Sequence, residues 1–226
     1  MNKNFSFLIG ALFCVFSLLF NLFIVKSENI PAEEIIDRMT LSIYGLSSYT
    51  CKVKMNANII DYGVNIGLNG TVYFKEPNKL ALKIDNLPEN VQEKYKLSFT
   101  QTAVPGMASK TYKEKYKAKL VGIRKFSNNR EVYVLYMEPY KSGSVKNVMM
   151  FVDTQNYTIP KSIIFYKDGG KILIEQRYSK IGDYYLPVKQ DVYFDFPKVR
   201  ANLVSEFYDY QINIKIDDSV FEKNKK

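Results

Sequence analysis

Histidine and tryptophan are absent from this chain of 226 residues, and cysteine occurs only twice. The lack of histidine excludes Ser-His and Cys-His nucleophile pairs as well as histidine-ligated metals. Two cysteines are too few for a four-cysteine zinc site or for a framework of several disulfides. Neither a glycine-rich phosphate loop nor a Gly-x-Ser-x-Gly motif is present. We therefore expect a protein that is not an enzyme and that holds no metal or cofactor.

The N-terminus carries an export signal. Lys3 precedes an uncharged and almost wholly apolar run over 5–25, and Ser27 closes a short segment of the kind that a signal peptidase reads. We predict a signal peptide over 1–27. Because the run is also long enough to span a bilayer, an uncleaved anchor in the inner membrane is the alternative. Both interpretations place residues 28–226 outside the cytoplasm, as for a periplasmic protein.

Each cysteine has a structural explanation. Cys14 lies inside the exported segment, and the bulky Phe13 before it argues against a lipoprotein signal. Cys51 is then the only cysteine of residues 28–226, so no internal disulfide can form there. A lone thiol without a histidine partner is typical of a small buried apolar residue. A hydrolase that depends on Cys51 is kept as an alternative.

Lysine and arginine outnumber aspartate and glutamate by 32 to 23, which gives a net charge of +9. Part of the excess gathers between residues 110 and 125. The candidate docking residues there are Lys113, Lys115, Lys117, Lys119, Arg124 and Lys125. We interpret them as a docking patch for an anionic membrane surface or an acidic membrane-protein partner. A solvated face is the alternative, and the export signal argues against a nucleic-acid partner.

The first element of the exported part is predicted to be a helix over 31–45. Pro31 suits the first turn of a helix, where its missing N–H costs nothing. Ile35, Met39 and Ile43 recur at helical spacing and form one apolar stripe. Because a single stripe must be buried against another element, we expect these three residues to face a sheet as the lid of its cavity.

After the helix the apolar period changes from helical spacing to two, which predicts strands. The predicted strands are 49–59, 64–75, 79–85, 95–103, 131–138, 145–153, 161–167, 171–179, 184–196 and 206–216. Residues 86–94 are predicted as a short helix or loop, and 104–119 as a basic helix or a loop. The pattern indicates one domain of the α+β class, mainly β, with about nine to eleven antiparallel strands in meander order.

The segment over 68–80 resembles a family. It reads Leu-Asn-Gly-Thr-Val-Tyr-Phe-Lys-Glu-Pro-Asn-Lys-Leu and is similar to the strand and turn of the outer-membrane lipoprotein-sorting (LolA-like) proteins, Gly-x-hydrophobic-aromatic-hydrophobic-Lys-x-Pro-Asn. Three other features of the sequence are similar to those of the family and occur in the same order. They are a helix that runs straight into a strand at 46–58, a strand that ends in an acidic residue and proline at 132–139, and an acidic turn followed by phenylalanine at 210–221.

The resemblance implies an open, incomplete antiparallel β-barrel whose concave face is covered by the N-terminal helix and short helices. The family's cavity shelters the acyl chains of lipoproteins, so the resemblance implies a carrier for lipoprotein acyl chains or lipid. Glu76 stands where proteobacterial carriers have arginine before Pro77. Relatives of this fold also act as lipid-sensing regulators or anchored envelope proteins. A membrane-anchored regulatory or structural interaction module without cargo is therefore the alternative function.

The wall of the expected cavity is assigned from strand alternation. Its predicted residues are Val53, Met55, Val72, Phe74, Leu82, Ile84, Val134, Tyr136, Met150, Phe165, Ile212 and Ile214. A register error of one residue would exchange a set of this kind for its neighbours on the other face of the sheet. All 18 tyrosines lie after residue 27, and the amount of apolar and aromatic side chain is also consistent with a plain core. We expect a monomer.

Overall fold

Eleven strands form one antiparallel sheet in the part of the chain that a computed structural model describes, which is residues 30–77, 79–85, 97–100, 112–126 and 129–222. The elements all belong to one compact unit, Pro31–Lys226, and the described core residues lie within this unit. The unit therefore carries its own hydrophobic core. Among these residues no helix is long and apolar enough to cross a membrane.

The order of the elements along the chain confirms a mainly β protein. The strands are β1 (Ser48–Ile59), β2 (Val64–Lys75), β3 (Lys79–Ile84), β4 (Leu97–Thr100), β5 (Tyr116–Lys125), β6 (Glu131–Pro139), β7 (Val145–Asp153), β8 (Lys161–Tyr166), β9 (Lys171–Ile181), β10 (Tyr184–Phe196) and β11 (Val199–Ile212). The described helices are α2 (Ala32–Leu41), α4 (Tyr112–Lys115) and the 3-10 turns η1 (Ile60–Tyr62) and η3 (Asp218–Phe221).

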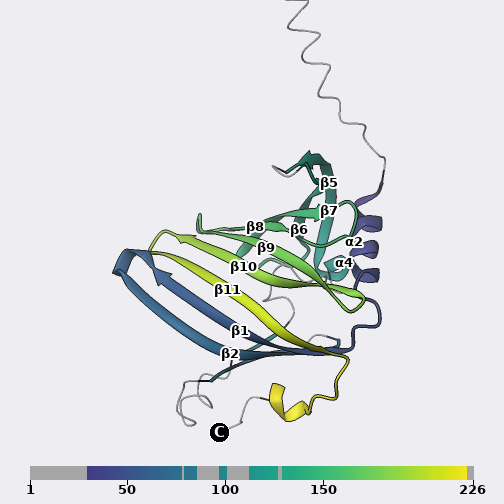
Figure 1. The fold of residues 1–226 in the computed structure, drawn as a ribbon. Coiled ribbons are helices and arrows are strands. Elements are labelled where there is room, and N and C mark those ends of the chain that lie inside the picture. The colour runs from purple at the N-terminus through teal and green to yellow at the C-terminus, as the bar shows by residue number, and fades with distance from the viewer. Residues whose placement is uncertain (1–29, 78, 86–96, 101–111, 127–128, 223–226) are drawn as a thin grey trace, which may run out of the picture. The chain divides into compact units, whose positions relative to one another are not determined.

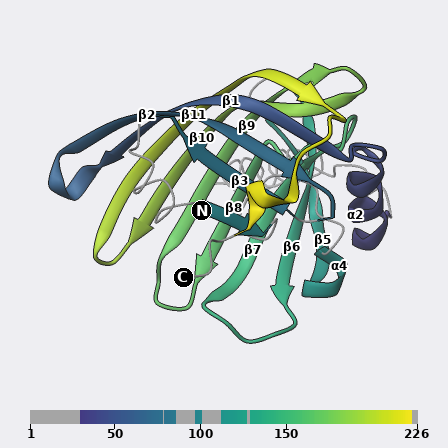
Figure 2. The ribbon, with the colours of Figure 1, turned by 90° about the horizontal axis from the view of Figure 1, so that it is seen from below.

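The sheet is two meanders joined where the first strand meets the last. The spatial order is β4-β3-β2-β1-β11-β10-β9-β8-β7-β6-β5. β1 pairs with β2 on one side and with β11 on the other (Figure 1). The sheet curves, as the view from below shows (Figure 2), and its two edge strands, β4 and β5, are not paired with each other in the described residues. The expected open, incomplete barrel is therefore confirmed.

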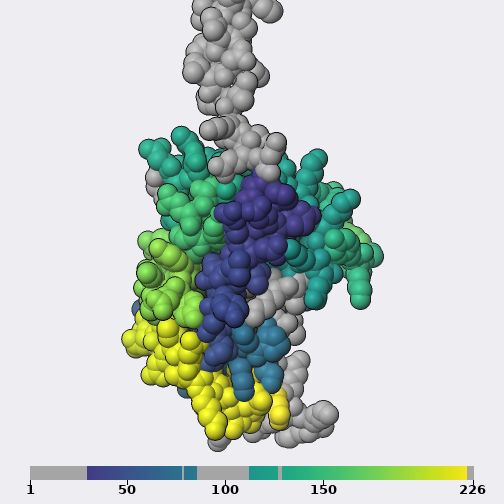
Figure 3. All heavy atoms as spheres, turned by 90° about the vertical axis from the view of Figure 1, so that its right-hand side faces the viewer, coloured from purple at the N-terminus to yellow at the C-terminus, as the bar shows by residue number. Residues whose placement is uncertain are grey.

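α2 lies across one end of the sheet. Pro31 is the residue before its first turn, and Glu33 and Glu34 lie in that turn, where the helix dipole favours negative charge. The helix gives way to a turn that ends at Gly45, whose φ of 84° suits glycine. Figure 3 looks onto this end of the unit and shows α2 at its centre, between β9–β10 on one side and β5–β7 on the other.

One face of the sheet carries the core, and we call it the inner face. This face can be followed from β1 to β6 through directly paired residues, with no register shift between them. The pairs are Val53–Phe207, Ser205–Gln190, Gln190–Gln176, Ile174–Ser162, Ser162–Met150 and Met150–Leu135. Directly paired residues of antiparallel strands lie on the same side of a sheet. The residues that alternate with these therefore lie on the opposite side, which we call the outer face.

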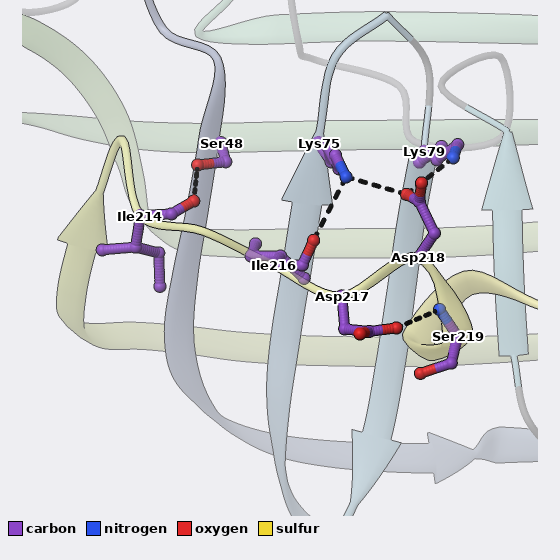
Figure 4. A network of polar contacts seen from close by, with 8 residues as sticks. All are labelled: Ser48, Lys75, Lys79, Ile214, Ile216, Asp217, Asp218 and Ser219. Carbon is purple, nitrogen blue, oxygen red and sulfur yellow. Dashed lines mark hydrogen bonds and ion pairs between the residues drawn. The ribbon is translucent and has the colours of Figure 1, made fainter.

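The C-terminal segment fastens the end of β11 to the β2–β3 hairpin (Figure 4). The Ser48 hydroxyl donates to the carbonyl of Ile214, and the Lys75 ammonium donates to the carbonyl of Ile216 at 3.1 Å. Asp218 accepts from the ammonium groups of both Lys75 and Lys79 at 2.8 Å. This segment therefore extends the β1–β11 pairing with a second set of contacts beyond the last strand.

The structure corrects two predictions about strands. Residues 104–119 were predicted as a basic helix or a loop: α4 agrees with a helix, whereas β5 begins at Tyr116 and was not predicted as a strand. Residues 86–94 and 104–111 lie outside the described residues. The last strand is β11, which begins at Val199 and ends at Ile212, earlier than predicted at both ends. β4 lies within the predicted 95–103, and the remaining residues of that range are outside the described part of the chain.

Strict alternation over the predicted strand 206–216 places Tyr208 on the same face as Tyr210 and Ile212. Tyr208 instead pairs with the exposed Lys52, because the register of β1 and β11 shifts near Asp209, which has a φ of 53°. Such a bulge inserts one extra residue and reverses the alternation beyond it. The expectation for Tyr208 was therefore wrong.

Candidate functional site

The inner face changes character along the strands. At the end that α2 covers, the side chains of Tyr49, Val53 and Phe74 are buried, the last two only 1% exposed. At the opposite end, near the β1–β2 hairpin, Val64 is 41% exposed and Ile66 is 42% exposed. The inner face therefore has a closed half, packed as a core, and an open half that remains partly accessible.

The closed half is a tight aromatic and aliphatic core. The rings of Tyr49 and Phe74 stack with their centroids 5.0 Å apart, and Tyr210 lies against Tyr49 at 5.6 Å. Leu46 and Leu186 are also buried in this cluster. Since these side chains pack against one another, this half of the inner face holds no room for a ligand in this folded arrangement.

The open half consists of apolar side chains from five strands, β2, β8, β9, β10 and β11. The register places them all on the inner face, and the exposure of each is intermediate or higher: Val64, Ile66, Leu68, Ile164, Ile172, Phe194 and Leu203. An antiparallel sheet normally turns polar side chains toward water. This surface instead presents accessible hydrocarbon on the side that curves inward, which is the composition expected of a site for apolar ligands.

The polar groups of the closed half carry no charge at neutral pH. Burial raises the pKa of the Cys51 thiol to about 12, although a hydrogen bond with Tyr210 works against this shift. Burial likewise raises the pKa of Tyr49, Tyr178 and Tyr210 well above their usual value. A thiol that stays protonated is a poor nucleophile, so the environment of Cys51 suits a core position.

Ser162 is a special case on the inner face. Its hydroxyl is the buried side-chain oxygen for which no hydrogen-bond partner is found among the described residues. The residue lies between Met150 and Ile174 on neighbouring strands, and Ile164 of the open half follows it on the same face. An unpaired buried hydroxyl costs stability unless something else accepts its hydrogen. It lies where the closed half meets the open half.

The predicted wall residues fall into three groups. Val53, Met55, Val72, Phe74, Leu82, Ile84, Met150 and Ile212 lie on the inner face. Most of these are buried in or beside the closed half, so their role in ligand binding stays a prediction. Ile214 lies beyond the end of β11, where its carbonyl accepts from Ser48.

Val134, Tyr136 and Phe165 lie on the outer face, so their prediction as inner-wall residues was wrong. Val134 pairs with Phe151 and Tyr136 with Met149, on the side opposite to Met150. Phe165 pairs with Asn147 on the same outer side. The physical reason is that β6, β7 and β8 are apolar on both faces, so their sequence alternation does not distinguish inside from outside.

The three residues of the expected lid are buried. Ile35 and Met39 lie in α2, and Ile43 lies in the turn that follows it. On its other side the helix is fastened by Arg38, which donates to the Tyr157 hydroxyl at 2.6 Å and pairs with Glu34 at 2.6 Å. α2 thus has a buried apolar side and one polar attachment to the β7–β8 turn.

The six residues of the expected docking patch do not form one uniform surface. Lys117, Lys119 and Arg124 are exposed on the outer face of the edge strand β5. Lys113, in α4, pairs with Asp37 of α2 at 2.5 Å, and Lys125 lies 3.8 Å from Glu131. The exposed Lys115 lies in α4. Docking by this patch remains a prediction.

The sequence interpretation missed the open half of the inner face. Ile172, Phe194 and Leu203 were inside or beside predicted strands, and the alternation in these strands was visible. The missing information was which end of each strand the helix covers. In the described residues no group of three or more Cys, Asp or Glu side chains is arranged to hold a metal ion.

These features define the class of protein by its architecture. The class has an open, curved antiparallel sheet with an apolar inner face and an N-terminal helix across one end. The fold is LolA-like. A candidate outer-membrane lipoprotein-sorting protein domain from Vibrio parahaemolyticus has a TM-score of 0.67 and 15% identity, over 84% of this chain and 96% of that one. A DUF1329 family protein from Desulfovibrio piger has a TM-score of 0.66 and 12% identity, over 85% and 97%.

A LolA superfamily protein from Nitrosomonas europaea is similar as well, with a TM-score of 0.56 and 13% identity, over 86% of this chain and 99% of that one. No family model matches the sequence, and no curated protein matches it. Identities this low establish a shared fold and leave the function to be argued from the site.

Proposed function

We propose that this chain is an extracytoplasmic binding protein that shelters the acyl chains of a lipid or lipoprotein on the inner face of its sheet. The observation that carries the proposal is the gradient of exposure along that face. The closed half holds the fold together, and the open half offers accessible side chains such as Ile172, Phe194 and Leu203. An acyl chain gains about 0.8 kcal/mol for each CH₂ that leaves water, so a surface of this kind supplies affinity without polar contacts.

Release of the ligand would depend on α2. The helix rests on Ile35 and Met39, and its polar attachments are the contact between Arg38 and Tyr157 and the ion pair between Asp37 and Lys113. An element held by few polar contacts can shift while the sheet stays intact. In this proposal movement of α2 would extend the open half toward the space that the closed half now fills.

Adjacent residues of β9 provide a matched test. Ile172 faces inward and Leu173 faces outward, and both are half-buried. We would express residues 28–226 in a periplasm, purify the protein without detergent and measure bound lipid by native and extracted-lipid mass spectrometry. Ile172→Glu is expected to abolish bound lipid, whereas Leu173→Glu is expected to keep it. The melting temperature of each variant shows whether it is folded.

A second function, an interaction module without cargo, is favoured by a different observation. A hollow of about 500 Å³ lies between α2 and the β7–β8 and β9–β10 turns. Leu41, which is 65% exposed, and the exposed Tyr185 line it, with Arg38 and Asp183 beside them. Exposed apolar side chains beside charged ones are typical of protein contacts. A lipid-free protein that takes up no added acylated peptide would contradict the carrier and leave this module as the better function.

A further inference from the structure

A second hollow, of about 540 Å³, lies beside β8 and β9 and is lined by outer-face residues together with Gln176 and Tyr178 of the inner face. Residues that line it include Phe126, Arg130, Asp153, Lys161, Glu175 and Arg177. None of them belongs to the open half of the inner face. The register places Lys161 and Glu175 opposite each other on β8 and β9, on the outer side of the sheet.

The hollow exists because β8 starts late. β7 ends at Asp153 and β9 extends to Ile181, but β8 begins only at Lys161. Pro160 still contacts β9, since its carbonyl accepts from the N–H of Gln176 at 2.8 Å, and the chain before it, back to Thr154, belongs to no strand. A gap on the outer face between β7 and β9 is the result, and the polar side chains of the three strands surround it.

Two acidic side chains in the hollow are already engaged. Asp153 is buried, lies 2.5 Å from Arg130 and also accepts from the backbone N–H of Gln155 and Asn156 at 2.9 and 3.0 Å. Glu175 pairs with Lys161 at 2.8 Å. Both carboxylates are thus matched by cations within the site, which makes it unsuited to a metal cation.

Arg177 supplies the remaining charge. It is exposed at the edge of the hollow, two residues beyond Glu175 on the same face, and its side chain has no ion pair or hydrogen bond within the described ranges of the chain. The hollow therefore holds three cationic side chains, those of Arg130, Lys161 and Arg177, and two carboxylates, each already paired with one of the first two cations. A guanidinium with its donors free is the group best suited to bind a phosphate or carboxylate in a bidentate manner.

Apolar side chains adjoin this charged hollow. Phe126 packs against Phe151 with ring centroids 5.9 Å apart, and Val132 lines the hollow next to Phe126. Arg124 of β5 pairs in register with Val132, so the basic outer face of β5 leads directly to the hollow. A basic pocket with an apolar wall favours an amphiphile over a fully polar solute.

We propose that this hollow binds the phosphate-bearing headgroup of an anionic lipid at a membrane surface, with Arg177, Lys161 and Arg130 as its cationic side. The length of the chain supports a membrane as the source. The apolar run ends at Val25 and α2 begins at Ala32, a distance of at most about 25 Å for an extended chain. If the run remains in the bilayer, α2 and the sheet end that it covers lie close to lipid headgroups.

Vesicle binding tests the proposal. The 28–226 fragment, which contains the whole described core, would be co-sedimented with vesicles of phosphatidylcholine alone and of phosphatidylcholine with phosphatidylglycerol, at about 0.15 M salt. Binding is expected only to the anionic vesicles. Arg177→Gln is expected to weaken it about tenfold, which is the effect of losing one strong charge-assisted hydrogen bond. Arg177 holds nothing else in place, so the variant is expected to melt like the parent.

Lys54→Gln is the matched control, because Lys54 is exposed on the outer face of β1 and its loss changes the net charge equally. Equal weakening by Lys54→Gln and Arg177→Gln, equal binding to neutral vesicles, or no vesicle binding would each overturn the proposal. Saturable binding of glycerol phosphate, followed by NMR, without any vesicle binding would assign the hollow to a free phosphate compound instead. Ile172→Glu is expected to keep vesicle binding, so failure of the carrier proposal would be seen separately.

Discussion

Lys75 and Asp218 lie 143 positions apart in the sequence, and their charged groups meet at 2.8 Å. Lys75 belongs to the strand-and-turn segment that resembles the LolA-like proteins, and Asp218 belongs to the acidic turn near the C-terminus that resembles them as well. Lys79 joins the same carboxylate, and its ammonium lies 5.9 Å from the ring of Phe221. The two segments that suggested the family are therefore in contact. This contact joins the segment after β11 to the β2–β3 hairpin.

Replacement of Asp218 by asparagine is expected to lower the melting temperature in a pH-dependent way. Hydrogen bonds from Lys75 and Lys79 lower the pKa of Asp218 to about 2. A carboxylate whose pKa is lower in the folded state stabilises the fold above its unfolded pKa, near 3.9, and loses this effect as the pH falls toward 2. The parent and Asp218→Asn should therefore differ at pH 6 and converge near pH 2.

Thermal unfolding at a series of pH values measures this difference. The exposed Asp85 lies at the end of β3 and has no ion pair among the described residues, so Asp85→Asn serves as the control. A difference that persists at pH 2 would show that Asp218 acts through packing rather than through its charge.

Truncation of Phe74 to alanine is expected to cost about 3–5 kcal/mol of the free energy of unfolding, which is the usual range for a buried phenylalanine. Phe74 is 1% exposed and stacks on Tyr49 in the closed half of the inner face. Tyr73→Ala, one residue away on the outer face, is the control and should cost clearly less. Urea denaturation measures both, and similar losses would contradict the assignment of the two faces.

Arg38→Ala is expected to loosen α2 while leaving the sheet intact. Arg38 contacts the Tyr157 hydroxyl and lies 5.6 Å from the centre of its ring, and this is the helix's polar attachment to the β7–β8 turn. Amide hydrogen exchange should become faster in Ala32–Leu41 and stay unchanged in the strands. Arg200→Ala removes a comparable ion pair with Asp61 at the opposite end of the sheet and should not affect α2. Equal exchange in α2 for both variants would show that the Tyr157 contact does not hold the helix.

Ser162→Ala is expected to be neutral or slightly stabilising, because it removes a buried hydroxyl that has no partner among the described residues. If this hydroxyl donates to an ester or amide carbonyl of a bound acyl ligand, the same variant should retain less lipid in mass spectrometry. The adjacent Ile163→Ala, on the outer face, is a control for lipid retention. A clear loss of stability in Ser162→Ala would mean that the hydroxyl has a partner in the folded protein.

Strand positions could be predicted well wherever the sequence alternated between turn signals. The bounds of β2, β7 and β10 agree with the predicted ranges, since glycine, proline or aspartate marks at least one end of each. β5 was missed although Tyr116, Ala118 and Leu120 alternate with lysines, because the lysine-rich composition also fits a helix. Alternation and composition gave conflicting answers there, and tertiary pairing with β6 decides the outcome.

The candidate site was harder to predict than the fold. A curved sheet that is apolar on both faces, as at Val134 and Leu135, offers no local signal for the inner side. The bulge at Asp209 likewise depends on pairing with β1 and not on any residue type typical of bulges. Face assignment in such strands needs the register of the neighbours, which only the folded sheet supplies.

The pairing of the first strand with the last has a consequence for the order of folding. β1 is the first strand of the sequence and its partner β11 is the last, whereas most other neighbours in the sheet are consecutive strands. Contacts between segments so distant in sequence form slowly. The hairpins of the two meanders are therefore expected to form first, and the central seam between β1 and β11 closes as the final step.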